Sequence, residues 1–125
     1  MNIARKDHGC FSIMQNGYVS KIVVMGGNNS SFLSSTEMLD VTSKQWQILP
    51  NLPFKVASNE GVESVVGPYF GYSVGGYTGN GLEKRIIGLR KQSSGNYQWI
   101  HVNWLTTARR ALSVVNAPIS MLPSC

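Results

Sequence analysis

The clearest catalytic pattern in the sequence is a serine between two glycines, followed further along the chain by an acid and a histidine. Residues 71–75 read Gly-Tyr-Ser-Val-Gly, which fits the motif that places a nucleophilic serine on a sharp turn between a strand and a helix. Glu83 and His101 follow Ser73 in the order serine, acid, histidine. The next residues, 75–81, read Gly-Gly-Tyr-Thr-Gly-Asn-Gly and cannot begin a helix. Ser73 is therefore predicted to be an ordinary strand residue, and no catalytic residue is assigned.

Two further patterns could hold a ligand, and each lacks a required part. The glycine-rich stretch 75–81 is not followed by the Gly-Lys-Ser/Thr of a phosphate-binding loop, so a long hairpin turn is predicted there. His8 and His101 are far apart, and no further ligand recurs at metal spacing. The two cysteines form no metal motif, and Cys10, among apolar neighbours, is predicted to be buried. The three tryptophans, Trp46, Trp99 and Trp104, are expected in the core and not at a cofactor. No cofactor and no metal are expected.

Composition favours one small, turn-rich β protein. The chain has 125 residues, of which 42% are hydrophobic, 14% charged and 13 are glycine. The low charge argues against a disordered chain or a coiled coil. The net charge is +5, but the basic residues are dispersed and are not interleaved with aromatic ones, so nucleic acid is not the expected partner. The sequence has no apolar run of signal-peptide or membrane-spanning length, which predicts a cytoplasmic protein.

Internal repetition is the strongest feature of the sequence. An apolar run ends in a glycine pair at residues 26–27 and again at residues 75–76, and a tryptophan follows each pair, at Trp46 and Trp99. The dipeptide Ala-Arg occurs at residues 4–5 and again at residues 108–109, two periods of about 52 later. Short apolar or alternating runs between turn residues predict four strands in each period. These are residues 10–14, 21–25, 36–41 and 46–49, then 61–66, 69–74, 85–89 and 97–102.

This pattern resembles the kelch repeat, which forms one four-stranded blade of a β-propeller. Residues 22–27 look like the second strand and double glycine of the family, and residues 37–41 look like its third strand. Trp46 and the following residues 49–53 look like its fourth strand and exit turn. The second repeat departs from the pattern, because it has Arg85 in its third strand and Lys55 in the loop that leads into the blade. The resemblance implies an all-β partial β-propeller of four-stranded antiparallel kelch-type blades.

About two and a half repeats are expected: residues 1–53, residues 54–105, and the start of a third at 106–125. A blade cannot bury both of its faces alone, and propellers usually have four to eight blades. Three explanations stay open. The chain is a fragment of a longer product, or three copies complete a ring by self-association, or it is a poorly stable remnant.

The resemblance also implies a function. Kelch-type propellers commonly bind other proteins through loops on one face, so a non-catalytic protein-interaction module is expected, a fragment or short form of a scaffold or adaptor. Carried over by position, the basic residues that lead into the blades are Arg5, Lys55 and Arg109, and they are predicted to contact a partner as exposed loop residues. The alternative is a piece of a propeller enzyme of the oxidase or sugar-processing type.

Overall fold

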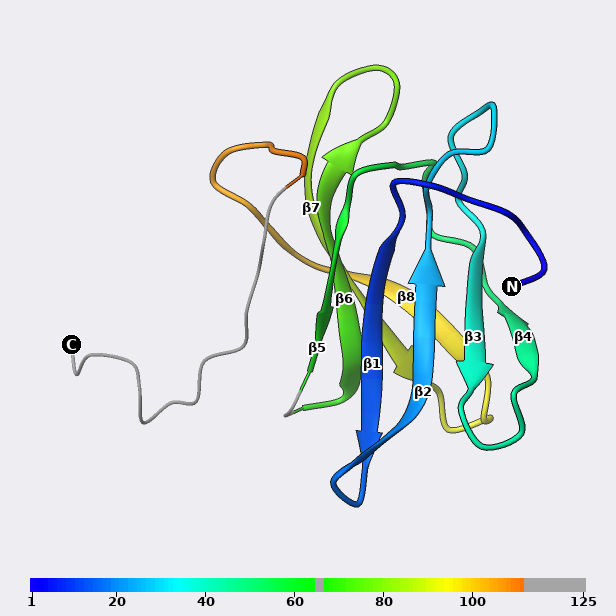
Figure 1. The fold of residues 1–125 in the computed structure, drawn as a ribbon. Coiled ribbons are helices and arrows are strands. Elements are labelled where there is room, and N and C mark those ends of the chain that lie inside the picture. Colours follow the sequence, from blue (N-terminus) through cyan, green and yellow to red (C-terminus); the bar gives the residue numbers. More distant parts are fainter. Residues whose placement is uncertain (65–66, 112–125) are drawn as a thin grey trace.

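In the part of the chain that the structure describes, eight strands form two four-stranded antiparallel sheets, each in simple up-and-down order (Figure 1). The computed structural model describes residues 1–64 and 67–111. The strands of the first sheet are β1 (Gly9–Gln15), β2 (Tyr18–Met25), β3 (Thr36–Asp40) and β4 (Trp46–Leu49). Those of the second are β5 (Glu60–Glu63), β6 (Tyr69–Tyr77), β7 (Leu82–Lys91) and β8 (Tyr97–Trp104). Within these residues no helix is long and apolar enough to cross a membrane.

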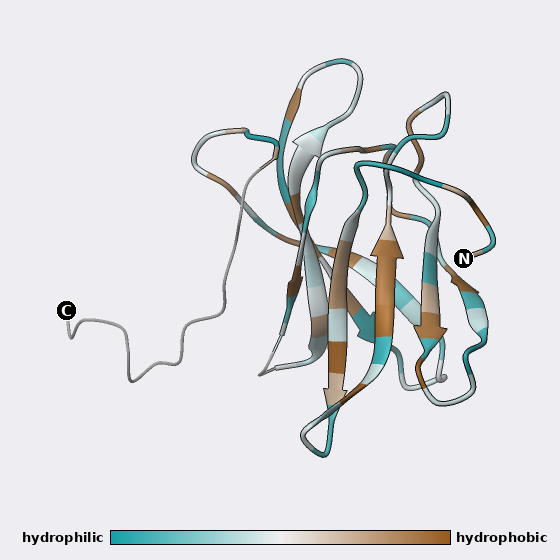
Figure 2. Cartoon of the chain, in the orientation of Figure 1, coloured by the Kyte–Doolittle hydropathy of each residue, from teal (hydrophilic) through white to brown (hydrophobic). Residues whose placement is uncertain are grey.

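The first sheet follows directly from local sequence. Asn16 and Gly17 both have positive φ, at 52° and 81°, which is the backbone of the tight turn that joins two twisted antiparallel strands. β1 and β2 then pair with Phe11 opposite Val23 and Cys10 opposite Val24. The hydrophobic end of β2, residues 22–25, is the longest such stretch in the sheet (Figure 2). The predicted strands of this repeat are thus present, each within a few residues of its expected bounds.

The second sheet repeats this order with a longer central hairpin. β6 runs on through the glycine pair to Tyr77, and β7 begins at Leu82. The prediction of a loop over the whole of residues 75–81 is therefore wrong. Gly75 and Gly76 take φ of 61° and 116°, and the pairing of β6 with β7 shifts register there, so the strand passes the glycines as a bulge.

The core lies between the two sheets, where alternate residues of both face each other. Phe11, Val23 and Met25 from the first sheet meet Ile87, Leu89 and Trp99 from the second. The Trp99 indole crosses this seam: its ring meets the Phe11 ring edge-on at 6.4 Å, and its N–H donates to the Pro50 carbonyl over 3.0 Å. β1 and β5 run closest together, because Gly61 leaves room for the backbone of Cys10. The seam resembles the packing of neighbouring blades.

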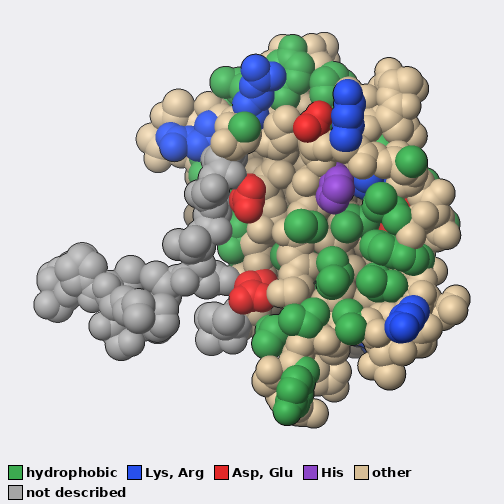
Figure 3. Space-filling view, in the orientation of Figure 1, with side chains coloured by type: hydrophobic (Ala, Val, Ile, Leu, Met, Phe, Trp, Pro, Cys, Tyr) green, Lys and Arg blue, Asp and Glu red, His purple; other side chains and the backbone are tan. Residues whose placement is uncertain are grey.

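The opposite face of the first sheet is not covered by the second. Hydrophobic side chains gather there (Figure 3), and Ile48 is 66% exposed. Residues 1–5 cover its upper part, which is why Val24 is buried. Trp46 also lies on this face and is half-buried.

Two burial predictions are wrong. Cys10 is exposed, because its side chain lies on this open face and only its backbone packs at the seam. Trp104, expected in the core, is 53% exposed at the end of the edge strand β8. Residues 112–125 of the predicted third repeat lie outside the described residues.

Candidate functional site

The serine, acid and histidine of the catalytic pattern are not brought together. Ser73 is 2% exposed in the middle of β6, and its hydroxyl accepts a hydrogen bond from the Asn59 side chain over 2.9 Å. It pairs with Ile87, which in turn pairs with His101, so His101 is two strands away, about 10 Å. Ser73 is thus a strand serine, as predicted.

The other candidate ligand patterns form no site. Gly75 and Gly76 belong to a strand, and the chain turns from β6 into β7 with no helix between them. The His101 ring meets the exposed Trp104 ring at a tilt of 54°, with 4.6 Å between the ring centres, whereas His8 is half-buried directly before β1. Within residues 1–64 and 67–111, no three histidine, cysteine or acidic side chains gather as a metal site would require.

The prediction that Arg5 is an exposed loop residue is wrong, because its side chain is fully buried. Its guanidinium donates to the Gly26 and Ser35 carbonyls over 2.7 and 2.8 Å and forms an ion pair with Glu37 at 2.9 Å. Both side chains of this pair are 0% exposed. Arg5 therefore ties the N-terminal segment to the glycine pair and to β3, and it has no surface to offer a partner in this structure.

Glu37 accepts further hydrogen bonds from the backbone N–H groups of Asn2 and Ile3, at 2.6 and 3.2 Å. Burial alone acts to raise the pKa of this carboxyl. The backbone N–H of Asn2, the Arg5 guanidinium and the N–H of Ile3 outweigh burial and hold the pKa below its ordinary value. A buried carboxylate at the start of a third strand thus stays charged.

The second sheet reaches the same result with a different cation. Glu83, the second residue of β7 as Glu37 is of β3, is 6% exposed and pairs with Arg85. It also accepts from the backbone N–H groups of Lys84 and Arg85 at 2.9 and 2.8 Å. Arg85 thus supplies the cation for this carboxylate from within β7. The two glutamates are not at equivalent positions, because Trp46 pairs with Leu39 and Trp99 with Leu89, which makes Ile87 the equivalent of Glu37. Its guanidinium also lies 3.7 Å from the centre of the Phe54 ring.

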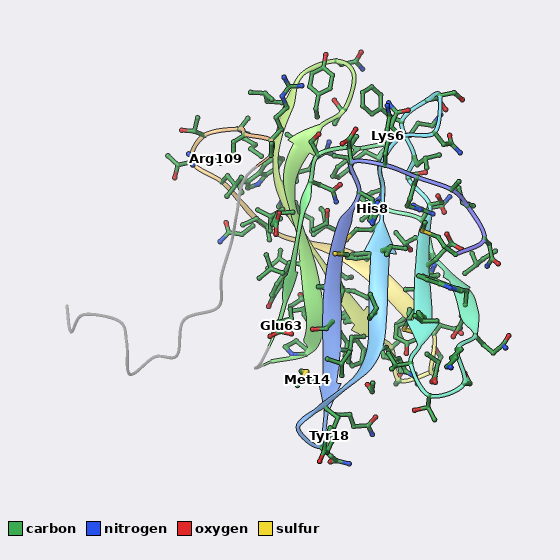
Figure 4. All side chains as sticks on the ribbon, viewed as in Figure 1. Lys6, His8, Met14, Tyr18, Glu63 and Arg109 are labelled. Atoms are coloured by element: carbon green, nitrogen blue, oxygen red, sulfur yellow. The ribbon has the colours of Figure 1, made fainter. Side chains whose placement is uncertain are left out.

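Lys55 and Arg109 are exposed and lie on the same edge of the molecule. Arg109 is held by its backbone, which exchanges hydrogen bonds with Gly76 and Glu83, and its side chain donates to the Thr107 carbonyl over 3.3 Å. The loop that carries Lys55 is fixed by the bridge between Ala57 and Tyr77. Figure 4 shows Arg109 on this upper edge together with Lys6. The structure thus brings two of the three predicted residues to one edge.

Sequence reasoning missed the aromatic centre of this edge. The Phe32 ring, from the β2–β3 loop, meets the Tyr77 ring edge-on at 5.6 Å, and the Arg110 guanidinium lies 5.3 Å from the Tyr77 ring centre. We call the set the upper loop surface, and it consists of Lys6, Phe32, Lys55, Tyr77, Arg109 and Arg110. No spacing in the sequence links Phe32 to Tyr77, because the contact exists only once the two sheets pack.

The charge balance leaves most cations without an acidic partner. All eleven lysines and arginines lie in the described part of the chain, and three of them form ion pairs there: Arg5, Lys21 and Arg85. Two of these three pairs involve the buried carboxylates Glu37 and Glu83. The net charge of +5 is therefore carried by exposed loops and strand ends.

Comparison with known families identifies the first sheet. Residues 20–53 match the family model described as the Kelch motif. The match covers most of β2, all of β3 and β4, the glycine pair and Trp46. None of the curated proteins matches the chain.

Proposed function

We propose that this chain, whose residues 20–53 match the Kelch motif, is a non-catalytic protein-interaction module that binds its partner through the upper loop surface. Kelch repeats generally mediate protein–protein interactions. The upper loop surface combines aromatic rings with exposed guanidinium groups, and these are the residue types that dominate the energy of protein interfaces.

The observation that carries this proposal is the joining of loops from both sheets at one edge. Phe32 belongs to the first repeat and Tyr77 to the second, and their contact holds the two hairpin ends together. Lys55 and Arg109 lie on the same edge with no carboxylate paired to them in the described residues. A partner that presents carboxylates beside an apolar side chain would complement both the rings and the charges.

The test compares capture by the wild-type chain with capture by a variant that carries Lys55→Glu and Arg109→Glu. Lys44→Glu is the matched control, because Lys44 is exposed in the β3–β4 turn at the opposite edge. We expect specific proteins captured by the wild type and by the control to be lost from the double variant, by quantitative mass spectrometry. Identical captured sets for all three chains would refute this role of the upper loop surface.

We also propose that the open face of the first sheet is covered by a further blade, supplied when copies of the chain associate. Trp46 lies on this face at the position where Trp99 of the second sheet reaches across the seam to Pro50. The exposed Ile48 side chain adds apolar surface that favours burial. Three copies of two blades would give a ring of six, within the usual range.

Light scattering after size-exclusion chromatography tests this association. We expect the wild-type chain to have the molar mass of an oligomer and Trp46→Ala to reduce it. A monomer with the near-ultraviolet circular dichroism of a packed protein would refute self-association.

A further inference from the structure

Backbone hydrogen bonds join each repeat to the segment that enters the next one, and the same set of three bonds occurs twice. In the first set, the Val56 N–H donates to the Leu33 carbonyl over 3.0 Å, and the Val56 carbonyl accepts from the Gly27 N–H over 2.8 Å. The Ser58 N–H completes the set by donating to the Asp7 carbonyl over 2.7 Å. We call these three bonds the junction set. They attach the segment before β5 to the first repeat.

The junction set recurs where the second repeat meets the segment after β8. The Arg109 N–H donates to the Glu83 carbonyl over 3.1 Å, and the Arg109 carbonyl accepts from the Gly76 N–H over 2.8 Å. The Ala111 N–H donates to the Ser58 carbonyl over 2.9 Å. All three partners lie one repeat further along the chain than in the first set. The segment after β8 is therefore arranged as the entry to a further blade.

The N-terminal segment has the same backbone shape as these two entry segments. Asp7, Ser58 and Ala111 lie one repeat apart and take φ of 53°, 54° and 48°. This left-handed conformation is uncommon for residues other than glycine, so its return at one period marks equivalent positions. Residues 5–7 are thus preformed as a blade entry.

Residues 5–7 have no junction set of their own. Within residues 1–64 and 67–111, no hydrogen bond reaches the N–H or the carbonyl of Arg5 or the N–H of Asp7. Lys6 exchanges both of its backbone hydrogen bonds with Asn28, so the backbone groups of its two neighbours point to the other side. The Arg5 side chain is 0% exposed although the residue is partly exposed, so its accessible part is backbone.

The second sheet of another copy matches these unpaired groups. They are the same two donors and one acceptor that residues 109–111 present, and the dipeptide Ala-Arg occurs in both segments, at 4–5 and 108–109. If copies associate in a ring, the second sheet of one copy precedes the first sheet of the next. Residues 5–7 then face the groups that residues 109–111 already hold. The two segments therefore compete for one site.

The segment after β8 is attached less firmly than the segment before β5. The Val56 side chain is 0% exposed and lies against the glycine pairs of both sheets. Arg109 and Ala111 are exposed, so their segment is attached mainly through its backbone. An exchange between copies replaces three backbone hydrogen bonds with three of the same kind. Burial of Trp46 and Ile48 on the open face of the first sheet then favours the exchange.

We propose that residues 5–7 of one copy bind the second sheet of another copy through the backbone of Ser58, Gly76 and Glu83, and that residues 109–111 regulate this association by occupying the same site. The partner is thus a second copy of this chain. This inference rests on the proposed self-association, and it adds the segment by which copies join and the segment that opposes joining.

Sedimentation equilibrium of two variants at Ala111 tests the competition. Proline cannot take a positive φ and has no N–H, so Ala111→Pro should release the segment and lower the dissociation constant of self-association by about tenfold. Glycine takes this conformation without strain, so Ala111→Gly should hold the segment more firmly and raise the dissociation constant by about fivefold. Lys44→Gly is the matched control, because Lys44 also has a positive φ, of 58°, in an exposed turn, and the change should leave association unaltered.

Amide hydrogen exchange measured by NMR identifies the segment that docks. In the oligomer we expect the Arg5 and Asp7 amides to exchange more slowly than in the monomer, and the Ala111 amide to exchange faster. Arg5 and Asp7 amides that exchange equally fast in both states would exclude residues 5–7 as the docking segment.

The variants also separate this inference from the self-association on which it rests. If the wild type associates and both Ala111 variants have its dissociation constant, the competition is wrong and self-association stands. If neither the wild type nor any variant associates, both proposals are wrong. Near-ultraviolet circular dichroism checks the packing of Ala111→Pro, and Ala111→Gly alone decides the outcome if the proline variant does not fold.

Discussion

Gly61→Ala tests whether the two sheets depend on their close contact at the seam. A Cβ built on Gly61 would lie 2.6 Å from the backbone nitrogen of Cys10, and closer still to the carbonyl carbon and oxygen of that residue. Ordinary contact begins at 3.4 Å, so β1 and β5 would have to separate by at least 0.8 Å. Because the obstacle is backbone on both sides, no side-chain rotation can relieve it.

The cost follows from what this separation does to the core. A gap of about 0.5–1 Å forfeits a quarter to a half of the dispersion energy of the atoms that face it. Phe11, Leu89 and Trp99 meet across the seam, and burying each is worth about 1.5–3 kcal/mol. We therefore expect Gly61→Ala to lower the free energy of unfolding by about 3 kcal/mol, within the range reported for overpacked cores.

Urea unfolding followed by tryptophan fluorescence measures this loss. Gly88→Ala is the matched control, because Gly88 also lies in a strand with an ordinary φ. Its new methyl group would meet the ring of Tyr69, a half-exposed side chain that can move, so its cost should be below about 1 kcal/mol. If Gly61→Ala unfolds at the same urea concentration as Gly88→Ala, the packed seam described above is wrong.

Three further predictions follow from the buried groups. Trp99→Ala should lower the free energy of unfolding by about 3–5 kcal/mol and Trp104→Ala by less than about 1 kcal/mol, because only the former leaves a cavity at the seam. Equal urea midpoints for the two variants would contradict this. Arg5→Met should lower the free energy of unfolding by about 3–5 kcal/mol, because it leaves the Glu37 carboxylate buried without its cation. In a double-mutant cycle, the variant Arg5→Met/Glu37→Leu should recover most of that loss, because it removes the buried charge as well. The pKa values of Glu37 and Glu83 are lowered in the folded chain, so their contribution to the free energy of unfolding should be constant above about pH 4.5 and should be lost as the pH falls below that value. A thermal midpoint that stays the same below about pH 4.5 would show that these carboxyls are not charged in the fold.

The strand pattern could be predicted from sequence because it depends on neighbours along the chain. Alternating apolar residues and the turn at Asn16 and Gly17 are enough to specify a hairpin and its register. The extra length of β6 could not be predicted in this way. Glycines usually end a strand, but here Ala57 pairs with Tyr77 and holds the strand together beyond them.

The candidate site depended on contacts that the linear sequence does not encode. Arg5 and Lys55 looked alike as basic residues that lead into a blade, yet Arg5 is buried on Glu37 and Lys55 is exposed. The difference arises because β3 offers Arg5 the Glu37 carboxylate. In β7 the residue two positions before the partner of the tryptophan is Ile87, so Lys55 has no equivalent carboxylate to bind there.

The sequence by itself determined that this chain forms repeated four-stranded sheets, since strand period, turn residues and repeat spacing are all local properties. Only the tertiary structure decided which faces and charges stay accessible. Trp99 and Trp104 are five residues apart in one strand, and one is buried while the other is exposed, because the first sheet reaches only the former. Lys21 and Lys91 likewise belong to different repeats, and they line one hollow only after the two sheets pack together.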